Sequence, residues 1–330
     1  MPESFRAYVV DNVDGKYSGG FRQLTDSDLP AEPVLVTVAY SSLNYKDGLA
    51  VTGKGKIVKK FPMACGIDLA GTVAESADPA FKPGDPVVVT GRGLSETMWG
   101  GYSAKQRINP AYLTRLPRGL TAKQAMAIGT AGFTAMLCVI ALEKAGVTPD
   151  RGDVLVTGAA GGVGSIAVAV LAKCGYRVVA STGRAQTHDY LKSLGAADFI
   201  ARTDLDRESR PLESKRWAGV VDSVGSKTLV TAIAQTRDEG AAAACGLVGG
   251  ADLPGNMMPF ILRGVKLLGV NCDTVPNALR DEAWTRLATD LDLAKLEDLT
   301  EVEPLSNIEA LAAQIVRGET RGRVVIDVNR

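Results

Sequence analysis

The residues with the clearest chemical meaning form a glycine-rich segment, VLVTGAAGGVG, at positions 154–164. Gly158, Gly161 and Gly164 directly follow an apolar run and open a stretch with helical spacing. Glycines in this context allow a tight turn, close approach of a ligand to the backbone, and close packing of the helix on the strand. The free N–H groups at the start of the helix suit a pyrophosphate. We therefore predict a dinucleotide-binding loop. Its expected backbone contacts are Ala160, Gly161, Gly162 and Val163.

The next apolar run indicates which dinucleotide binds. An NAD site carries an acidic residue about 20 positions further on, which takes the ribose hydroxyls. Here the run ends instead in Ser181, Thr182, Gly183 and Arg184. Hydroxyls and a guanidinium suit a 2′-phosphate, and Arg202, after the following run, would lie at the same edge of the sheet. The pattern favours NADPH, although Arg184 could also simply begin a solvated helix.

The elements around this loop alternate between strands and helices. Strands are predicted at 153–157, 177–181, 197–200, 218–222 and 242–248, with a last one at 266–270. Helices are predicted between the first three of them, at 165–173 and 186–194. Strands joined by single helices must run parallel, because each crossover returns the chain to the same end of the sheet. This part of the chain is predicted to be a doubly wound α/β domain.

The first hundred or so residues have a different pattern. Short apolar or β-branched runs at 34–40, 71–74 and 86–90 are separated by turn signals, which is typical of a small β-barrel. A final strand at 323–328 stands apart from the α/β block and is expected to complete the N-terminal domain. We predict an α/β protein with a barrel domain at 1–123, completed by 272–330, and a nucleotide-binding domain at 124–271.

Composition excludes several classes of function. The 37 Lys and Arg residues balance 37 Asp and Glu residues, so nucleic acid and anionic membranes are not expected partners. Five cysteines without a CxxC pair, and one histidine, indicate neither a disulfide framework nor a zinc knuckle. The N-terminus lacks the long apolar core of a signal peptide, and the apolar run 125–142 is interrupted by glycines and threonines, as in a buried helix. We expect a soluble, reduced, cytoplasmic protein.

Three further stretches resemble the medium-chain dehydrogenase/reductase superfamily: NYKD at 44–47, GIDLAG at 66–71 and GTAGFTA at 129–135. The likeness extends over essentially the whole chain. It implies a GroES-like barrel facing a Rossmann domain across a cleft. Longer runs resemble one subfamily, labelled quinone oxidoreductase-like, whose characterised members are NADPH-dependent acrylyl-CoA reductases. These runs lie at 41–47, 52–57, 61–63 and 259–265.

The resemblance also bears on zinc. Zinc-dependent members of the superfamily carry Cys, His and Cys at the positions of Asn44, Ile67 and Thr130. An amide, an aliphatic chain and a hydroxyl do not make a normal zinc site, and the cysteine cluster of the structural zinc is missing. We expect no metal.

Hydride transfer from NADPH to the β-carbon of an acryloyl thioester is the reaction that the resemblance implies. The negative charge on the enolate oxygen would then need hydrogen-bond donors, for which Asn44, Tyr45, Lys46 and nearby backbone N–H groups are candidates. Asp47 is better suited to orient a neighbour, because an ordinary Asp is ionised at neutral pH. Tyr45 could instead contact the cofactor, and the whole run could be a polar strand end with satisfied hydrogen bonds.

Other residues are expected around the cofactor and the substrate. The resemblance places Thr130 and Thr134 beside the nicotinamide, although threonines inside a helix commonly bond back to carbonyls. Further expected cofactor contacts are Leu247, Ile261 and Cys272. The phosphates of a CoA ester would be attracted by Lys54 and Lys56, in a short basic run with Lys59 and Lys60. Weaker candidates of the same kind are Arg92 and Arg263.

Two other functions remain open. An NADPH:quinone or general enone reductase would use the same hydride geometry on an uncharged acceptor. A non-catalytic NADPH-binding protein is the second alternative, since folds of this kind are reused. The resemblance implies a homodimer formed by edge pairing of the Rossmann sheets, through the apolar run 266–270.

Overall fold

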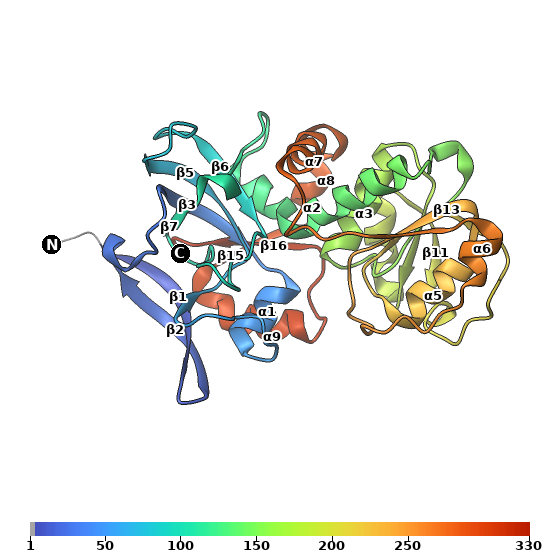
Figure 1. Cartoon of the computed structure of the whole chain (residues 1–330), viewed down its shortest axis with the longest axis horizontal. Coiled ribbons are helices and arrows are strands. Elements are labelled where there is room, and N and C mark those ends of the chain that lie inside the picture. Colours follow the sequence, from blue (N-terminus) through green and yellow to red (C-terminus); the bar gives the residue numbers. More distant parts are fainter. Residues whose placement is uncertain (1–3) are drawn as a thin grey trace. The chain divides into compact units, whose positions relative to one another are not determined.

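The computed structural model describes residues 4–330, and the chain divides into two units (Figure 1). The first unit contains the chain up to Thr130 together with Cys272–Thr274 and Glu297–Arg330. The second contains Ala131–Asn271 and Val275–Leu296. This division differs from the predicted boundaries, which put 124–130 in the nucleotide-binding domain and 275–296 with the barrel.

The helix α7 (Asn277–Asp290) explains the second difference. Trp284 of α7 stacks on Phe133 with ring centroids 6.1 Å apart, and Arg286 of α7 donates to Glu143 at 3.0 Å. Both partners belong to the long helix α2 (Ala122–Lys144). An aromatic stack and a charge-assisted bond therefore attach α7 to the second unit.

The first unit is mostly antiparallel β-structure, as expected for a GroES-like domain. A seven-stranded sheet has the order β15-β16-β3-β5-β6-β8, with β7 paired to β3, and a three-stranded sheet has the order β2-β1-β4. The strands are β1 (Phe5–Val13), β2 (Lys16–Leu24), β3 (Val34–Ser42), β4 (Met63–Ala64), β5 (Asp68–Ser76), β6 (Pro86–Thr90), β7 (Lys105–Ile108), β8 (Thr114–Arg115), β15 (Thr300–Pro304) and β16 (Arg323–Asp327).

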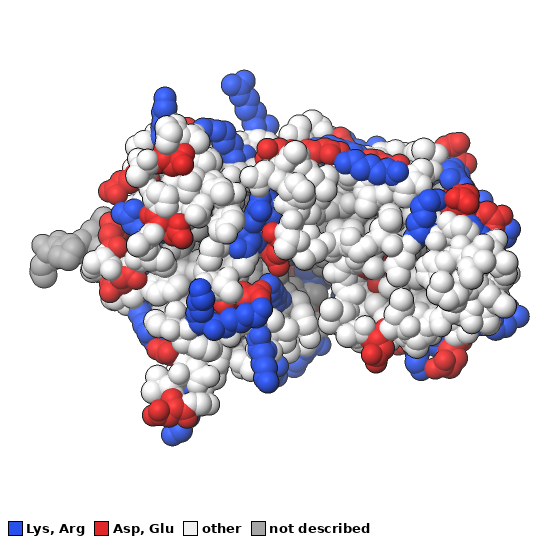
Figure 2. All heavy atoms as spheres, in the orientation of Figure 1, with Lys and Arg blue, Asp and Glu red and all other residues white. Residues whose placement is uncertain are grey.

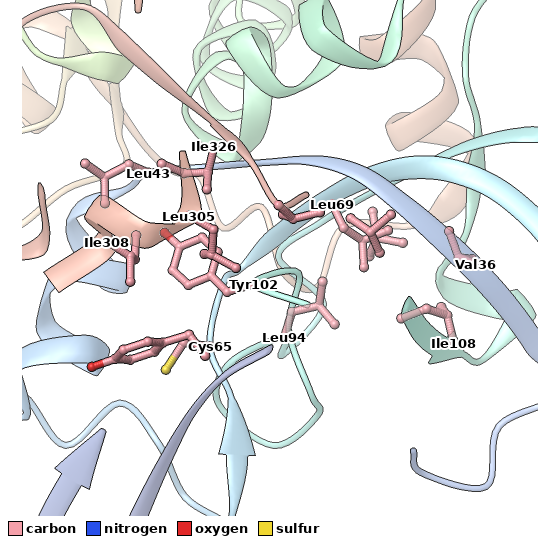
Figure 3. Packing of buried hydrophobic residues seen from close by; sticks show 14 of the residues in the cluster. Val36, Leu43, Cys65, Leu69, Leu94, Tyr102, Ile108, Leu305, Ile308 and Ile326 are labelled. Atoms are coloured by element: carbon pink, nitrogen blue, oxygen red, sulfur yellow. The ribbon is translucent and has the colours of Figure 1, made fainter. Parts of the chain in front are cut away.

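The C-terminal strand β16 pairs antiparallel with β3, with Val325 opposite Ser42. The expectation that the final strand completes the N-terminal domain is confirmed. Side chains from distant segments meet in the hydrophobic core of the first unit, where Leu43, Leu305 and Ile326 lie together (Figure 3). Each fully buried side chain of this size contributes roughly 1.5–3 kcal/mol of transfer free energy.

Two helices of the first unit, α1 (Tyr45–Thr52) and α9 (Ile308–Val316), pack against each other (Figure 1). The approach is close because α1 carries Gly48, where a Cβ would lie 2.6 Å from Cγ2 of Ile315. The start of α1 holds the Asn44–Asp47 run, so this packing fixes the residues that were expected to do chemistry.

The second unit contains a six-stranded parallel sheet in the order β11-β10-β9-β12-β13-β14. The strands are β9 (Val154–Val156), β10 (Val178–Thr182), β11 (Ala196–Ala201), β12 (Trp217–Asp222), β13 (Thr236–Ala244) and β14 (Lys266–Gly269). The helices that join them include α3 (Gly162–Lys173), α4 (His188–Leu194), α5 (Ser226–Ala234) and α6 (Met258–Arg263). The doubly wound prediction is confirmed. The strand order reverses between β9 and β12, and ligands of such sheets bind outside the carboxyl ends of the strands at that point.

The helix α2 is long and apolar enough to cross a membrane by length and composition, but 89% of its most apolar window is buried within the protein. This burial is typical of a core helix. Gly129 interrupts α2 with φ 54° and ψ −167°.

Positive and negative side chains are interspersed over the viewed faces of the units, without a broad field of one sign (Figure 2).

Candidate active site and cofactor site

Asp47 is completely buried and accepts three hydrogen bonds at the start of α1. The N–H of Asn44 donates to its Oδ2 at 2.9 Å, the Asn44 amide donates to the same oxygen at 3.1 Å, and the N–H of Ile67 donates to its Oδ1 at 2.8 Å. Burial, together with the nearby Asp68 carboxylate, raises the pKa of Asp47 to about 7. The carboxylate is an internal acceptor that caps the helix, in line with the expected orienting role.

Asp68, at the start of β5, is the acceptor for a wider cluster. Its Oδ2 receives the hydroxyl of Ser42 at 2.5 Å, the amide of Asn44 at 2.9 Å and the N–H of Thr130 at 2.8 Å. Its Oδ1 receives the hydroxyl of Thr130 at 2.5 Å. One buried carboxylate therefore brings together Asn44 and Thr130, two positions that carry zinc ligands in the zinc-dependent branch.

Arg323 of β16 reaches the same cluster from the other end of the chain. Its Nε donates to the carbonyl of Ala127 at 2.7 Å, and its Nη1 and Nη2 lie 3.3 Å from Oδ1 of Asn44. A Cβ at Gly129 would lie 2.6 Å from Nη2 of Arg323 and 2.8 Å from Oδ2 of Asp68. Glycine is thus required here both by its positive φ and by the space that the cluster occupies.

These contacts change the expected role of Asn44. Its amide group faces Ser42, Asp47 and Asp68, and its oxygen accepts from Arg323. An amide has two hydrogens to donate, and three acceptors already surround them. Asn44 is therefore better suited to hold the cluster together than to donate to a substrate.

Lys46 is also engaged. Its ammonium lies 2.7 Å from Oε2 of Glu96 and 3.5 Å from Oδ2 of Asp273. Burial acts to lower the pKa of Lys46, but the bonds to these two carboxylates outweigh it and raise the pKa. Of the four residues in the run, Tyr45 has the most exposed side chain, at 42%. The hydroxyl of Tyr45 remains the best candidate for donation to a substrate oxygen.

The predicted substrate cations have different surroundings. Lys54 and Lys56 are exposed, whereas Lys59 is paired with Glu96. Arg92 has φ 60° and its guanidinium lies 5.7 Å from the ring centroid of Tyr112.

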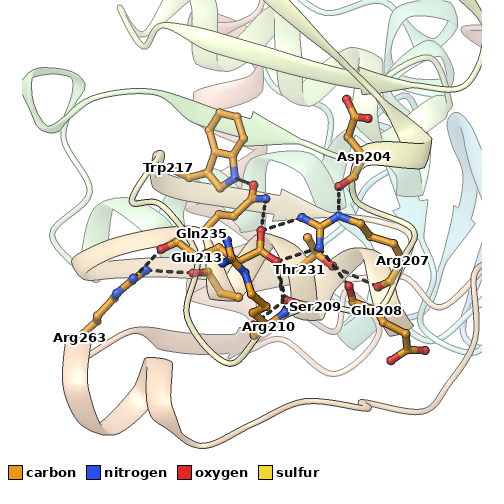
Figure 4. A network of polar contacts seen from close by, with 11 residues as sticks. Asp204, Arg207, Glu208, Ser209, Arg210, Glu213, Trp217, Thr231, Gln235 and Arg263 are labelled. Atoms are coloured by element: carbon orange, nitrogen blue, oxygen red, sulfur yellow. Dashed lines mark hydrogen bonds and ion pairs between the residues drawn. The ribbon is translucent and has the colours of Figure 1, made fainter.

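Arg263 belongs to the second unit, where its guanidinium binds backbone carbonyls. Its guanidinium donates to the carbonyls of Glu213, Ala234 and Thr236 at 2.6, 2.9 and 3.1 Å (Figure 4). The same network contains a bidentate pair between Arg207 and the Glu213 carboxylate, at 2.8 and 2.7 Å. Because Nη1 and Nη2 already donate to carbonyls, Arg263 is less suited than an exposed lysine to meet a CoA phosphate, and its substrate role stays a prediction.

The glycine loop has the geometry that a pyrophosphate site requires. Gly158 has φ 58°, and a Cβ there would lie 2.5 Å from Oγ of Ser223. A Cβ at Gly164 would lie 2.4 Å from the carbonyl oxygen of Gly158, so α3 packs directly on the turn. Gly161 caps α3 and Gly162 begins it. The loop lies at the carboxyl end of β9, next to the reversal of strand order.

The predicted 2′-phosphate residues are also brought together. Ser181 and Thr182 end β10, and the N–H of Arg184 donates to Oγ1 of Thr182 at 3.1 Å. A Cβ at Gly183 would lie 3.0 Å from Cζ of Arg202, so the guanidinium of Arg202 covers this glycine. The Thr182 hydroxyl and the Arg202 guanidinium at the end of β10 suit a phosphate ester, whereas Ser181 is only 2% exposed. NADPH therefore fits the residues present.

The remaining predicted cofactor residues are spread over both units. Thr134 is buried in the second unit, where Leu247 and Ile261 are 67% and 72% exposed. Thr130 and Cys272 belong to the first unit.

Sequence reasoning missed several residues of the first unit's cluster. Ser42, Asp68 and Arg323 received no role, although Asp68 lies within the GIDLAG stretch and Arg323 begins an otherwise apolar strand. A charged residue inside a buried apolar run needs a hydrogen-bonding partner. This signal could have marked Asp68 and Arg323 as members of a buried polar cluster. Glu96 and Asp273, the partners of Lys46, carry no comparable local pattern.

Comparison with known proteins agrees with this geometry. A family model for the alcohol dehydrogenase GroES-like domain matches residues 30–147, and one for zinc-binding dehydrogenases matches residues 162–289. Acrylyl-CoA reductase AcuI of Ruegeria pomeroyi is 51% identical over 98% of this chain and 99% of its own length. The chain belongs to the quinone oxidoreductase-like branch of the medium-chain dehydrogenase/reductase superfamily.

Two solved structures of this branch share the fold over nearly the whole chain. YhdH of Escherichia coli K-12 with bound NADPH has a TM-score of 0.95 and 50% identity, covering 98% of this chain and all of that one. The yhfP protein of Bacillus subtilis with bound NAD has a TM-score of 0.95 and 41% identity, covering 98% of this chain and 99% of that one.

Zinc, which one family model names, does not fit the residues of this chain. Asn44 and Thr130 are hydrogen-bonded to Asp68, and Ile67 offers no ligand atom. Within residues 4–330 no group of three or more His, Cys, Asp and Glu side chains could hold a metal ion. Amide and hydroxyl groups are not the ligands that protein zinc sites use.

Proposed function

We propose that this protein reduces the carbon–carbon double bond of acryloyl-CoA to propanoyl-CoA with NADPH. The observation that carries the proposal is the 51% identity to Acrylyl-CoA reductase AcuI over 98% of this chain. A hydride is added to the β-carbon and a proton to the α-carbon, so the thioester gains two hydrogens and NADPH becomes NADP⁺. The intermediate charge is that of an enolate on the thioester oxygen.

In this proposal the second unit holds the cofactor, which supplies the hydride. Arg184, Arg202 and the hydroxyls of Ser181 and Thr182 bind the 2′-phosphate in this proposal, which is supported by their place at the end of β10 and by the Arg202 guanidinium over Gly183. The N–H groups at the start of α3 bind the pyrophosphate. The residues that end and follow β10, Ser181–Arg184, include no acidic side chain, which favours NADPH over NADH.

Residues of the first unit meet the charge that develops on the substrate. The hydroxyl of Tyr45 donates to the thioester oxygen, and Asn44, Asp47 and Asp68 hold the start of α1 that carries it. Such a preorganised donor stabilises the enolate without having to reorient during the reaction. Thr130 donates its hydroxyl proton to Asp68 and so belongs to the groups that hold this cluster in place.

The exposed lysines Lys54 and Lys56 attract the phosphates of CoA, with Arg92 as a further contact. Their attraction should be screened by salt.

The deciding experiment compares kcat/KM for acryloyl-CoA with that for a simple quinone, using NADPH and the purified protein. We expect a preference for the thioester of at least tenfold; a preference for the quinone overturns the proposal.

A quinone or general enone reductase is the second candidate. Glu96 neutralises part of the basic run by pairing with Lys46 and Lys59, which reduces the charge available to bind CoA. Turnover of an uncharged enone at least as fast as of acryloyl-CoA, with no dependence on ionic strength, would favour this candidate. Tight NADPH binding without oxidation by any of these acceptors would favour a non-catalytic protein.

A homodimer is part of the proposal. β14 is the last strand in the order of the six-stranded sheet, and apolar side chains near it in sequence are exposed, with Ile261 at 72% and Leu262 at 63%. A second copy pairing along β14 would cover them. Analytical ultracentrifugation should show a dimer that Ile261→Lys weakens; a wild-type monomer at micromolar concentration would contradict this.

A cytoplasmic location is also part of the proposal. It is supported by the five free cysteines, which are typical of proteins in reducing compartments.

A further inference from the structure

Asp222 is a fully buried carboxylate at the end of β12, outside the residues to which the chemistry is assigned. Its Oδ1 accepts the hydroxyl of Thr157, the residue between β9 and Gly158, at 2.6 Å. Its Oδ2 accepts the N–H of Gly225 at 2.7 Å. One carboxylate thus joins the loop that follows β9 to the loop that follows β12, on the two sides of the reversal of strand order.

The backbone of Asp222 reaches a third loop. Its carbonyl accepts the N–H of Cys245 at 2.9 Å and the thiol of the same residue at 3.3 Å. Cys245 follows β13, which neighbours β12 in the sheet. The loops after three adjacent strands are therefore all bonded to this one residue.

Thr157 makes the connection in both directions. While its hydroxyl donates to Asp222, the same oxygen accepts the N–H of Ser223 at 3.1 Å, and the hydroxyl of Ser223 donates to the carbonyl of Thr157 at 3.1 Å. A Cβ at Gly158 would lie 2.5 Å from Oγ of Ser223, so the glycine loop begins in direct contact with this turn. The start of the glycine loop is held by hydrogen bonds on one side and by packing on the other.

We propose that Asp222 and Thr157 are positioning residues for cofactor binding, which hold the glycine loop in the shape that receives the pyrophosphate. The inference rests on the proposed use of NADPH. Hydrogen bonds to a buried carboxylate are stronger than neutral ones, and a loop that is ordered before binding does not pay the ordering cost when the ligand arrives. Neither side chain needs to touch the cofactor for this effect.

The test measures dissociation constants on the cofactor-free full-length protein by fluorescence titration with NADPH. Thr157→Val keeps the side-chain volume but removes the hydroxyl, and Asp222→Asn removes the charge. We expect each to raise the Kd of NADPH about tenfold, as for a lost charge-assisted bond. Thr157→Ser keeps the hydroxyl, so its Kd should equal that of the wild type. Asp153→Asn is the control, because Asp153 precedes β9 at the opposite end and pairs with Arg177 at the surface.

A second ligand separates positioning from general loosening. Adenosine 2′-monophosphate carries the 2′-phosphate but no pyrophosphate, so its affinity should change less than twofold in both variants. In steady state, the KM of NADPH should rise while kcat at saturating NADPH stays within twofold. Amide hydrogen exchange of 158–164 should be faster in Thr157→Val than in the wild type, without any cofactor present.

Two results would overturn the inference: an unchanged Kd of NADPH in Thr157→Val, or an equal loss of affinity for adenosine 2′-monophosphate. Since Thr157→Val preserves shape, it keeps the test valid if Asp222→Asn does not fold. Failure of the wild type to bind NADPH would instead contradict the proposed function, so the two failures are distinguishable.

Discussion

The hydroxyl of Thr130 donates to the carboxylate of Asp68 at 2.5 Å, across 62 positions of sequence. Since Asp68 also accepts from Ser42 and Asn44, it is the common acceptor of the buried cluster in the first unit. In zinc-dependent relatives a metal ion would connect these positions; here a carboxylate does so. The cluster links α1, β5 and α2 through hydrogen bonds to this carboxylate.

Replacing Asp68 should therefore affect stability. Asp68→Asn exchanges an acceptor of four hydrogen bonds for an amide that can accept at only one of its two polar atoms, and we expect a loss of about 2–4 kcal/mol in the free energy of unfolding. Asp26→Asn, which removes a surface pair with Lys105, should cost less than about 1 kcal/mol. Urea denaturation measures both. Equal losses would show that Asp68 is not the centre of the cluster.

Gly129 provides a steric test of the same cluster. Gly129→Ala puts a Cβ 2.6 Å from Arg323 at a positive φ, whereas Gly119→Ala has a positive φ but nothing within 4 Å. The second variant should cost about 1 kcal/mol through the backbone alone. The first should cost a further ~1–3 kcal/mol through overpacking, in addition to the strain of a ψ of −167° that lies outside the left-handed α region. Thermal denaturation of the two variants gives the difference, and equal losses would contradict the steric requirement for glycine.

Tyr45→Phe tests the proposed donor. Without the hydroxyl, kcat for acryloyl-CoA should fall about 100–1,000-fold, as for the loss of one oxyanion donor, while the Kd of NADPH stays unchanged. Tyr40→Phe, a half-buried tyrosine on β3, is the matched control. If Tyr45 is a cofactor contact instead, the Kd of NADPH will rise and kcat will be retained.

Arg202 and Gly183 together should set the choice of cofactor. Arg202→Ala removes a guanidinium, and Gly183→Ala adds a Cβ only 3.0 Å from where that guanidinium lies. Both should raise the KM of NADPH about tenfold or more and leave that of NADH nearly unchanged. Steady-state kinetics with each cofactor checks this. Equal effects on NADH would mean that Arg202 does not meet the 2′-phosphate.

Stability should also depend on Glu213 at acid pH. The bond from Arg207, more than any other contact, lowers the pKa of Glu213 from 4.5 to about 2. A carboxyl whose folded pKa is lowered contributes stability above the unfolded pKa, and this contribution is lost as the pH falls from 4.5 towards 2. The difference between wild type and Glu213→Gln in urea denaturation should therefore be largest at pH 7 and shrink by about 1–3 kcal/mol near pH 3. A difference independent of pH would contradict the ion pair.

The fold could be predicted because its signals are local. The β9–α3 loop, the parallel strands and the final strand follow from hydrophobic period and glycine spacing. The partners of side chains could not be predicted in the same way. In the sequence Asn44 and Lys46 look like free hydrogen-bond donors. In the structure Asn44 donates to Asp68, and Lys46 pairs with Glu96 and with Asp273, which lies 227 positions away. The strand predicted at 242–248 is also too long at its end, because β13 stops at Ala244. The next residue, Cys245, bonds to Asp222 and begins the loop, and the sequence gives no sign of that partner.

The late position of β16 has a consequence for how the protein is made. Translation delivers Asp47 and Asp68 to the growing chain more than 250 residues before Arg323 leaves the ribosome. Until then β3 lacks one of its neighbouring strands, β16, and the guanidinium that completes the carboxylate cluster is missing. The N-terminal segment therefore cannot take its final form before β16, about 280 residues further along the chain, has been synthesised.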